Sequence, residues 1–257
     1  MDKNNNQIKA QKDQSLFNSI AESYSKKDFS ESSRTARKLR LKQTLAKVNL
    51  SNDIDIIEIG CGAGFAATYL EGSYKNYTGI DYSEKLIKNA KYFNKKTNIS
   101  FIAKDLYQFG TKKKYDILFM IGVLHHMVDM DHAIKVACSF IKPGGYIVVN
   151  EPQKANPLIH LLRIIRSKTD KSYSEDQEEL NIDHLISLFK NAGLTNVKSF
   201  PQGLFSTPFA EVVLNPQFIF KYLSKIVCSI DKLIEDKFTI LLNKLSWNTI
   251  IIGQKEL

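Results

Sequence analysis

The chain has 257 residues, 43% of them hydrophobic, which is enough for one α/β domain with a sizeable buried core. No stretch is apolar for long enough to span a bilayer, and the polar start of the chain excludes a secretory signal peptide. The cysteines, Cys61, Cys138 and Cys228, are scattered without metal-ligand spacing, so we expect a reduced, cytoplasmic protein.

The net charge is +9, and Lys and Arg outnumber Asp and Glu in the first fifty residues. Such an excess attracts anionic substrates, nucleic acid or membrane surfaces. The lysines are spread along predicted helices and are not interleaved with aromatic residues, so an ordinary solvated surface is the favoured interpretation. Nucleic acid is therefore not the expected partner, and a tRNA-associated protein is the alternative class.

Residues 1–50 predict a helical N-terminal cap. Residues 1–14 are polar and aperiodic, which is typical of disorder. Helical patterns follow at Ser15–Tyr24 and Ser32–Val48, the second with a partial apolar stripe.

Strands and helices then alternate, which predicts a parallel sheet with right-handed crossovers and an α/β, Rossmann-like doubly wound fold. The predicted strands are Asp55–Ile59, Tyr77–Asp81, Ile99–Asp105, Tyr115–Gly122, Tyr146–Glu151, Asn196–Phe200 and Trp247–Gly253. The predicted helices are Phe65–Leu70, Glu84–Phe93, Asp131–Ile141, ended by the turn Lys142–Gly145, and Ile182–Ala192.

The stretch Asp55–Phe65 is a β-branched strand that runs into three glycines, Gly60, Gly62 and Gly64, before a helix. Glycine lets the backbone turn tightly and approach a ligand, and a helix N-terminus presents free N–H groups. The loop therefore indicates a nucleotide-like ligand. It also fits the dinucleotide pattern G-x-G-x-x-A, but no Lys, Ser or Thr forms a phosphate cradle, so a nicotinamide enzyme is the weaker alternative.

Several motifs occur in one order along the chain: Glu58-x-Gly-x-Gly-x-Gly64, Gly79-Ile-Asp81, Lys104-Asp105-Leu106, Tyr115-Asp-Ile-Leu118, Val123-Leu-His-His126 and Ile141-Lys-Pro-Gly-Gly145. This set resembles the class I S-adenosylmethionine (SAM) methyltransferases that act on small molecules. The resemblance implies a SAM-binding domain at residues 51–257. It also implies a seven-stranded sheet whose last strand runs antiparallel between strands five and six.

Asp81 closes the second predicted strand, 21 residues after Gly60, and a carboxylate at this spacing can accept bonds from both ribose hydroxyls. The resemblance places the adenine amino group on Asp105, with the Leu106 N–H beside it and Tyr82 against the ring. It implies that the carbonyls of Ile121 and Gly122 face the methionine ammonium, and that Glu58 supports that end. Tyr24 would help to close the pocket, and the loop would contact SAM through Gly60, Cys61, Gly62 and Gly64.

Methyl transfer to a hydroxyl needs a group that removes a proton. His125 and His126 directly follow the fourth predicted strand, and Glu151 ends the fifth, so these are the candidate catalytic residues. A role for the histidines in shaping the pocket stays open. In the related quinone-precursor O-methyltransferases this segment carries glutamates reported as metal ligands. Gly122 and His125 stand there instead, so no metal site is expected.

The acceptor is expected to be a small or amphiphilic molecule such as a sugar, a lipid-linked intermediate or a secondary metabolite. No Asn/Asp-Pro-Pro-Tyr/Phe and no Pro-Cys follows the fourth strand, which argues against methylation of nucleic-acid bases. The oligomeric state and the methylated atom are not predicted.

Two stretches exceed the minimal fold, at about 152–179 and 202–246. The second has large apolar residues at near-helical spacing, among them Phe218, Tyr222 and Ile226. It could roof the acceptor site, thicken the core, form a dimer contact or touch a membrane surface. Its mixed charges predict no strong attraction to anionic lipid.

Overall fold

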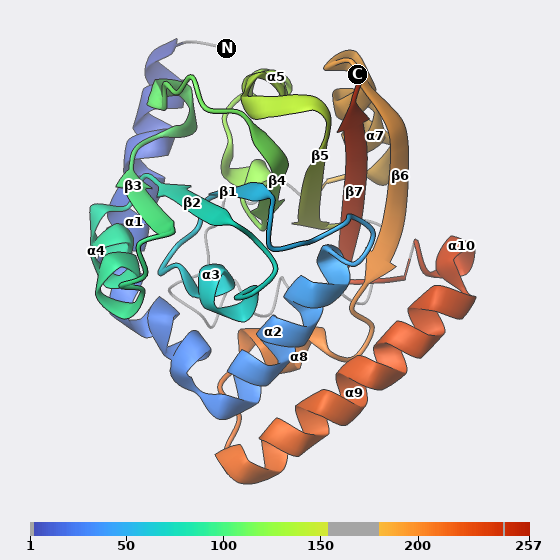
Figure 1. Cartoon of the computed structure of the whole chain (residues 1–257). Helices are drawn as coiled ribbons and strands as arrows, with labels where there is room; N and C mark the ends of the chain where they lie inside the picture. The colour runs from blue at the N-terminus through green and yellow to red at the C-terminus, as the bar shows by residue number, and fades with distance from the viewer. Residues whose placement is uncertain (1–2, 154–179, 244) are drawn as a thin grey trace.

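One seven-stranded sheet organises the part of the chain that this computed structural model describes, residues 3–153, 180–243 and 245–257 (Figure 1). The strand order is β3-β2-β1-β4-β5-β7-β6, and only β7 runs antiparallel to its neighbours. The predicted doubly wound sheet, with its antiparallel last strand between the fifth and sixth, is confirmed. The strands are β1 (Asp55–Ile59), β2 (Asn76–Asp81), β3 (Ile99–Ala103), β4 (Tyr115–Ile121), β5 (Ile141–Pro152), β6 (Leu194–Gln202) and β7 (Asn248–Lys255).

Helices cover both faces of the sheet. On one face α2, α3 and α4 contribute to a buried cluster, and on the other face α5 and α7 do so. The α-helices of the described residues are α1 (Lys3–Phe29), α2 (Glu31–Thr44), α3 (Phe65–Tyr69), α4 (Glu84–Phe93), α5 (Met130–Phe140), α7 (Ile182–Asn191), α8 (Thr207–Glu211), α9 (Gln217–Lys237) and α10 (Thr239–Leu242). Two short 3₁₀ helices, η1 (Leu106–Gln108) and η2 (Leu124–His126), follow β3 and β4.

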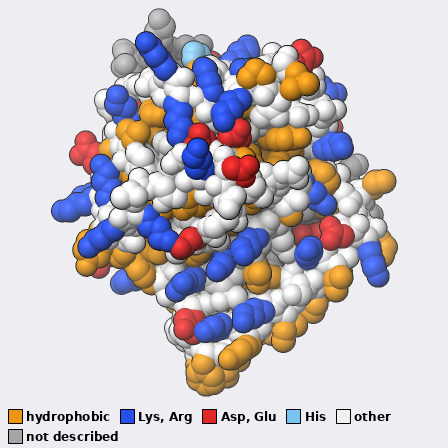
Figure 2. All heavy atoms as spheres, in the orientation of Figure 1, with side chains coloured by type: hydrophobic (Ala, Val, Ile, Leu, Met, Phe, Trp, Pro, Cys, Tyr) orange, Lys and Arg blue, Asp and Glu red, His pale blue; other side chains and the backbone are white. Residues whose placement is uncertain are grey.

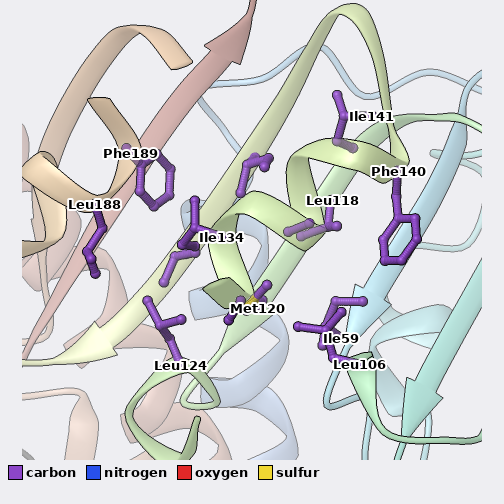
Figure 3. Packing of buried hydrophobic residues seen from close by; sticks show 14 of the residues in the cluster. Ile59, Leu106, Leu118, Met120, Leu124, Ile134, Phe140, Ile141, Leu188 and Phe189 are labelled. Carbon is purple, nitrogen blue, oxygen red and sulfur yellow. The ribbon is translucent and has the colours of Figure 1, made fainter. Parts of the chain in front are cut away.

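The central strand β4 shows why its sequence is a continuous apolar run. Successive side chains point to opposite faces, so Leu118 and Met120 enter the cluster under α5 and α7, while Ile117 and Phe119 enter the other cluster. Figure 3 shows Leu118 and Met120 among Ile134 of α5 and the side chains of α7. A strand buried on both faces needs no polar alternation.

The direction of strand addition reverses at β1. The chain first adds β2 and β3 on one side of β1 and later adds β4 on the other. Ile59 of β1 pairs with Met120 of β4, so the carboxyl ends of the two strands lie together. In open α/β sheets this switch point is where ligands bind.

The start of the chain differs from the expectation. Residues 3–14, predicted to be disordered, extend the first helix, which runs as α1 from Lys3 to Phe29. Once a helix has formed, each added residue gains a hydrogen bond, so polar Lys and Gln residues can prolong it without an apolar stripe. The ends of several strands shift by one or two residues. The start of β5 shifts by five, because Lys142–Gly145, predicted as a turn, belongs to this strand, with an irregular register beside β4.

Of the two predicted insertions, 154–179 lies outside the described residues. The other forms α8, α9 and α10. The apolar side chains of α9 do not roof a site: Phe218, Tyr222 and Ile226 are exposed, and the buried residues of this helix are Ser224, Cys228, Asp231 and Glu235. Periodicity predicted the helix, but the apolar stripe faces outward.

Candidate active site

The glycine loop after β1 passes through left-handed backbone, with φ of 70° at Gly60, 52° at Gly62 and 75° at Gly64. At Gly60 and Gly64 a side chain is also excluded by space, because a Cβ would lie 2.3 Å from Val123 and 2.5 Å from Phe101. A Cβ on Gly62 would have one neighbour within 4 Å, Tyr24 at 3.7 Å. Close packing therefore requires glycine at positions 60 and 64, whereas Gly62 leaves room for a ligand.

Asp81, at the end of β2, holds this loop in place. Its Oδ2 accepts the N–H of Gly62 at 2.9 Å, and its Oδ1 accepts the N–H of Ser83 at 2.8 Å. Burial raises the pKa of the carboxyl, although the two N–H bonds favour its charged form. Each carboxylate oxygen keeps a second lone pair. Asp81 thus has a structural role that sequence reasoning missed, and it retains the capacity to accept ligand hydroxyls.

A cavity of about 830 Å³ opens beside the loop at the carboxyl ends of the strands. It brings together most of the residues predicted to bind the cofactor, namely Tyr24, Gly60, Gly62, Asp81, Tyr82, Asp105, Leu106, Ile121 and Gly122. Glu58 and Cys61 line a second cavity instead. Gly64 lines neither, in keeping with its packing role.

At the β3 side of the first cavity, Asp105 caps the short helix η1. Its Oδ1 accepts the N–H of Tyr107 at 2.8 Å. Leu106 is buried in the core and fixes the direction of this turn. Tyr82 has a buried hydroxyl for which the described residues offer no hydrogen-bond partner. A capping bond at Asp105 leaves its other oxygen available, so capping and ligand binding are compatible.

Helix α1 supplies further site residues, of which sequence reasoning missed Asp13 and Gln14. The Gln14 amide donates to the carbonyl oxygen of Tyr82 at 2.8 Å, and Asp13 lies 3.2 Å from Nδ1 of His126. Phe17 makes edge contacts with Tyr24, Tyr82 and His126. The polar pattern that suggested disorder before residue 15 was in part the pattern of a helix whose polar side chains face a cavity.

His125 and Glu151 form a buried pair. Nδ1 of His125 lies 2.6 Å from Oε2 of Glu151, and Oε1 accepts the N–H groups of Val123 and Leu124 at 2.9 and 2.7 Å. A carboxylate can only accept, so Nδ1 carries the ring proton. Nε2 of His125 then presents its lone pair, and it has no partner among the described residues. Glu151, which is 0% exposed, therefore fixes both the position and the tautomer of His125.

His126 lies in a different environment. Its ring is 4.1 Å from that of His125, and burial lowers its pKa, with Asp13 acting in the opposite direction. Both cavities reach His126, whereas His125 lines the second cavity and not the first. The two histidines are adjacent in sequence but have different partners, Glu151 for His125 and Asp13 for His126.

The second cavity measures about 560 Å³ and adjoins the first. Gly122 lines both, has φ of 64°, and would direct a Cβ to a place with no heavy atom within 4 Å. The boundary between the two cavities therefore includes bare backbone at Gly122, beside the side chains of Phe17, Tyr24 and His126, which also line both cavities. The wall of the second cavity includes Glu58, His125 and the cationic residues Lys27, Arg37 and Arg40.

Glu58 lines the second cavity, and its side chain is almost completely buried. Its carboxyl is hydrogen-bonded to the Tyr77 hydroxyl, and burial raises its pKa to about 8. Burial therefore favours the neutral acid form of this carboxyl, which can donate a hydrogen bond.

The comparisons with known proteins agree with this geometry. A family model described as a methyltransferase domain matches residues 50–198, more than half of the chain. The chain belongs to the class I SAM-dependent methyltransferases. A SAM-dependent methyltransferase of Thermotoga maritima superposes with a TM-score of 0.64 at 16% identity, covering 94% of this chain and 98% of that one, which shows the shared fold.

Two curated relatives are similar over part of their length. One is a ubiquinone biosynthesis O-methyltransferase of Rickettsia conorii, 30% identical over 46% of this chain and 42% of the relative. The other is a malonyl-[acyl-carrier protein] O-methyltransferase of Ilyobacter polytropus, 32% identical over 37% of this chain and 38% of the relative. The chain spans about two-fifths of the length of these relatives.

SAM is the cofactor of this family, and the first cavity suits it. The unpartnered Tyr82 hydroxyl, the free lone pairs of Asp81 and the bare backbone at Gly62 and Gly122 offer polar contacts and close approach. Within residues 3–153, 180–243 and 245–257, no group of three or more His, Cys, Asp or Glu side chains is placed to hold a metal ion. None of the helices in these ranges has the length and apolarity needed to cross a membrane.

Proposed function

We propose that this methyltransferase transfers a methyl group from SAM to a small or amphiphilic acceptor bound in the second cavity. The observation that carries the proposal is the Glu151–His125 pair. It orients His125, which lines the second cavity beside the Gly122 backbone that both cavities share and whose Nε2 has no partner in the described part of the chain.

Bound SAM supplies an electrophilic methyl group on a sulfonium. His125 would accept the proton of an acceptor hydroxyl at Nε2 while the oxygen attacks that methyl group. The oxygen–carbon bond would form as the carbon–sulfur bond of bound SAM breaks, and the imidazole of His125 would keep the proton. Glu151 then faces an imidazolium, which a buried carboxylate at 2.6 Å stabilises.

Two further features support an oxygen acceptor with a proton to lose. Both curated relatives described above are named O-methyltransferases, which favours methylation of an oxygen atom. A hydroxyl also needs a base, and burial of the His125–Glu151 pair keeps bulk water from competing for the proton.

The proposal is tested with methyl-labelled SAM and a small-molecule extract, with a total RNA preparation as a second substrate. Label in the small-molecule fraction supports the proposal. Label that only nuclease releases supports the alternative, a tRNA-associated methyltransferase. His125→Ala should reduce transfer by roughly two to four orders of magnitude while SAM affinity is retained. His126→Ala is the matched control and should cost less. Equal, mild losses in the two variants would contradict a role for His125 as the base.

A further inference from the structure

Arg40 of α2 is a buried cation without a direct partner. It is 8% exposed, lines the second cavity, and makes no side-chain hydrogen bond or ion pair within the described part of the chain. An unpaired buried guanidinium is costly, and burial lowers its pKa. The neighbouring Arg37, by contrast, already pairs with Asp28 at 2.8 Å.

The nearby acidic side chains are engaged elsewhere. Asp231 accepts the N–H groups of Leu204, Phe205 and Ser206, and Glu235 accepts the N–H of Gly203. Glu211 pairs with Lys27 at 3.4 Å. The negative charges of these carboxylates partly offset the free-energy cost of burying Arg40. None of them lies within ion-pair distance of its guanidinium. Asp231 and Glu235 hold the backbone at 203–206, which connects Gln202 and Thr207 of the cavity wall.

A second unpartnered donor lies beside Arg40. Thr207, the first residue of α8, has a buried hydroxyl without a hydrogen-bond partner in the described ranges. A Cβ on Gly203 would come within 2.3 Å of this hydroxyl and within 3.4 Å of Nη2 of Arg40. Oγ1 of Thr207 and Nη2 of Arg40 therefore lie close to each other, and both residues line the cavity that His125 reaches.

We propose that Arg40 and Thr207 bind an anionic group, a carboxylate or a phosphate, carried by the methyl acceptor. The inference rests on the proposed function, since it names the substrate class of the same cavity. Arg40 supplies charge and a planar set of donors, and Thr207 supplies a hydroxyl that completes the contact. The acceptor is then an anionic molecule with a hydroxyl that reaches Nε2 of His125.

Two probes test the subsite without methyl transfer. Phenyl phosphate and benzoate are titrated by calorimetry into the wild-type chain, into Arg40→Met and into Thr207→Val. The control is Arg34→Met, at an exposed position of the same helix. We expect at least one probe to bind the wild type and the control, and Arg40→Met to weaken binding roughly 10- to 150-fold. Which probe binds distinguishes a phosphate from a carboxylate.

Failure of both probes to bind the wild type, or binding of a probe to Arg40→Met that equals its binding to the wild type, overturns the subsite. SAM titration confirms that each variant is folded, and Arg40→Met should fold because an apolar side chain suits a buried site. If probe binding depends on Arg40 but no small molecule is ever methylated, the proposed function is wrong and the subsite stands.

A second observation, independent of the cavity, concerns the exposed face of α9. Phe218, Tyr222 and Leu233 are 67%, 63% and 63% exposed, and Ile226 and Ile230 lie in the same stripe. Figure 2 shows hydrophobic side chains along the lower right edge of the molecule, where Figure 1 places α9. Contiguous apolar surface of this kind marks an interaction site.

The charges beside this stripe are basic. Lys221, Lys225 and Lys232 follow one flank of α9, while Asp231 and Glu235 are buried and hold the 203–206 backbone. Two of the three carboxylates of this helix thus face inward, and the third, Asp236, lies 3.9 Å from Lys47. Lys221 pairs with Glu31 of α2 at 3.2 Å, so Lys225 and Lys232 carry the basic character of this flank.

We infer that α9 docks on an anionic lipid surface, lying in the interface with its apolar stripe toward the acyl chains. A helix of 21 residues is about 30 Å long and offers the stripe along its whole length. The net charge of +9 favours an anionic bilayer over a second copy of this chain, which would carry the same charge.

Flotation with vesicles tests the docking. Wild-type protein should float with phosphatidylcholine–phosphatidylglycerol vesicles and less with phosphatidylcholine alone. Ile226→Asp and Leu233→Asp should abolish flotation without loss of SAM binding, since both positions are exposed. Tyr92→Asp, at a position on α4 that is 69% exposed, is the matched control. The inference is overturned if the α9 variants float as the wild type does. It is also overturned if light scattering shows a stable wild-type dimer that dissociates in these variants.

Discussion

Replacing Glu151 by Gln should disable the site while preserving its shape. In the wild type, Oε1 accepts two backbone N–H groups and Oε2 accepts Nδ1–H of His125. The single oxygen of a glutamine must stay on the two N–H groups, because its NH2 would clash with them. The NH2 then donates to Nδ1, which forces the ring proton onto Nε2. The variant therefore holds His125 in the tautomer that cannot accept a proton.

The magnitude follows from the contacts. Three charge-assisted hydrogen bonds become neutral ones, each weaker by about 1 kcal/mol, and relief from burying a charge offsets part of this loss. We expect a decrease of about 1–3 kcal/mol in the free energy of unfolding, and a fall in turnover of roughly two to four orders of magnitude. Glu151→Ala should destabilise more, because it leaves buried N–H groups unpaired.

The assay combines urea denaturation, SAM calorimetry and ¹⁵N NMR of the imidazole. The NMR readout needs no acceptor: the wild type should show a proton on Nδ1 of His125, and Glu151→Gln a proton on Nε2. Asp116→Asn, which removes a carboxylate that pairs with Lys142, is the control. A folded Glu151→Gln variant with wild-type turnover, or with an unchanged tautomer, would refute the reasoning.

Three further predictions concern β1, its glycine loop and Asp81, which holds that loop. Asp81→Ala should weaken SAM binding by roughly 1.5–3 kcal/mol for each charged hydrogen bond lost; undiminished affinity in calorimetry would contradict this. Glu58 has an ordinary pKa of 4.5 that burial raises to about 8, so the folded state holds an extra proton between these values and stability falls as pH rises through them. Glu58→Gln should flatten that slope in denaturation at pH 5 and pH 8, and an unchanged slope would count against the assignment. Gly64→Ala should cost more than Gly72→Ala, because both have positive φ but only Gly64 has a neighbour, Phe101, in the way; equal melting losses would contradict the overlap.

The sheet and its glycine loop were predictable because local patterns encode them. Buried β-branched runs and alternate glycines identify β1 and its loop without knowledge of the rest of the fold. Asp81 followed from its spacing to Gly60. The structure confirms where these residues lie. It adds that Asp81 fixes the glycine loop by accepting a hydrogen bond from the Gly62 N–H.

The remaining features depend on contacts between distant segments. Gln14 and Asp13 reach the site because α1 packs across it, and their polar sequence gave no such signal. The pairing of His125 with Glu151 joins residues on two neighbouring strand ends, which the sequence placed in one region but not in contact. For α9, a 3.6-residue period predicts a face and not its direction, so the outward stripe could not be predicted.

The most direct test of the account is a crystal structure with S-adenosylhomocysteine, the demethylated product of SAM. We predict that its ribose contacts Asp81, its adenine lies between Tyr82 and Asp105, and its sulfur reaches Gly122 with its open side toward the second cavity and Nε2 of His125. A sulfur atom that points away from the second cavity, or a ligand bound outside the first cavity, would contradict the assignment of the two cavities to cofactor and acceptor.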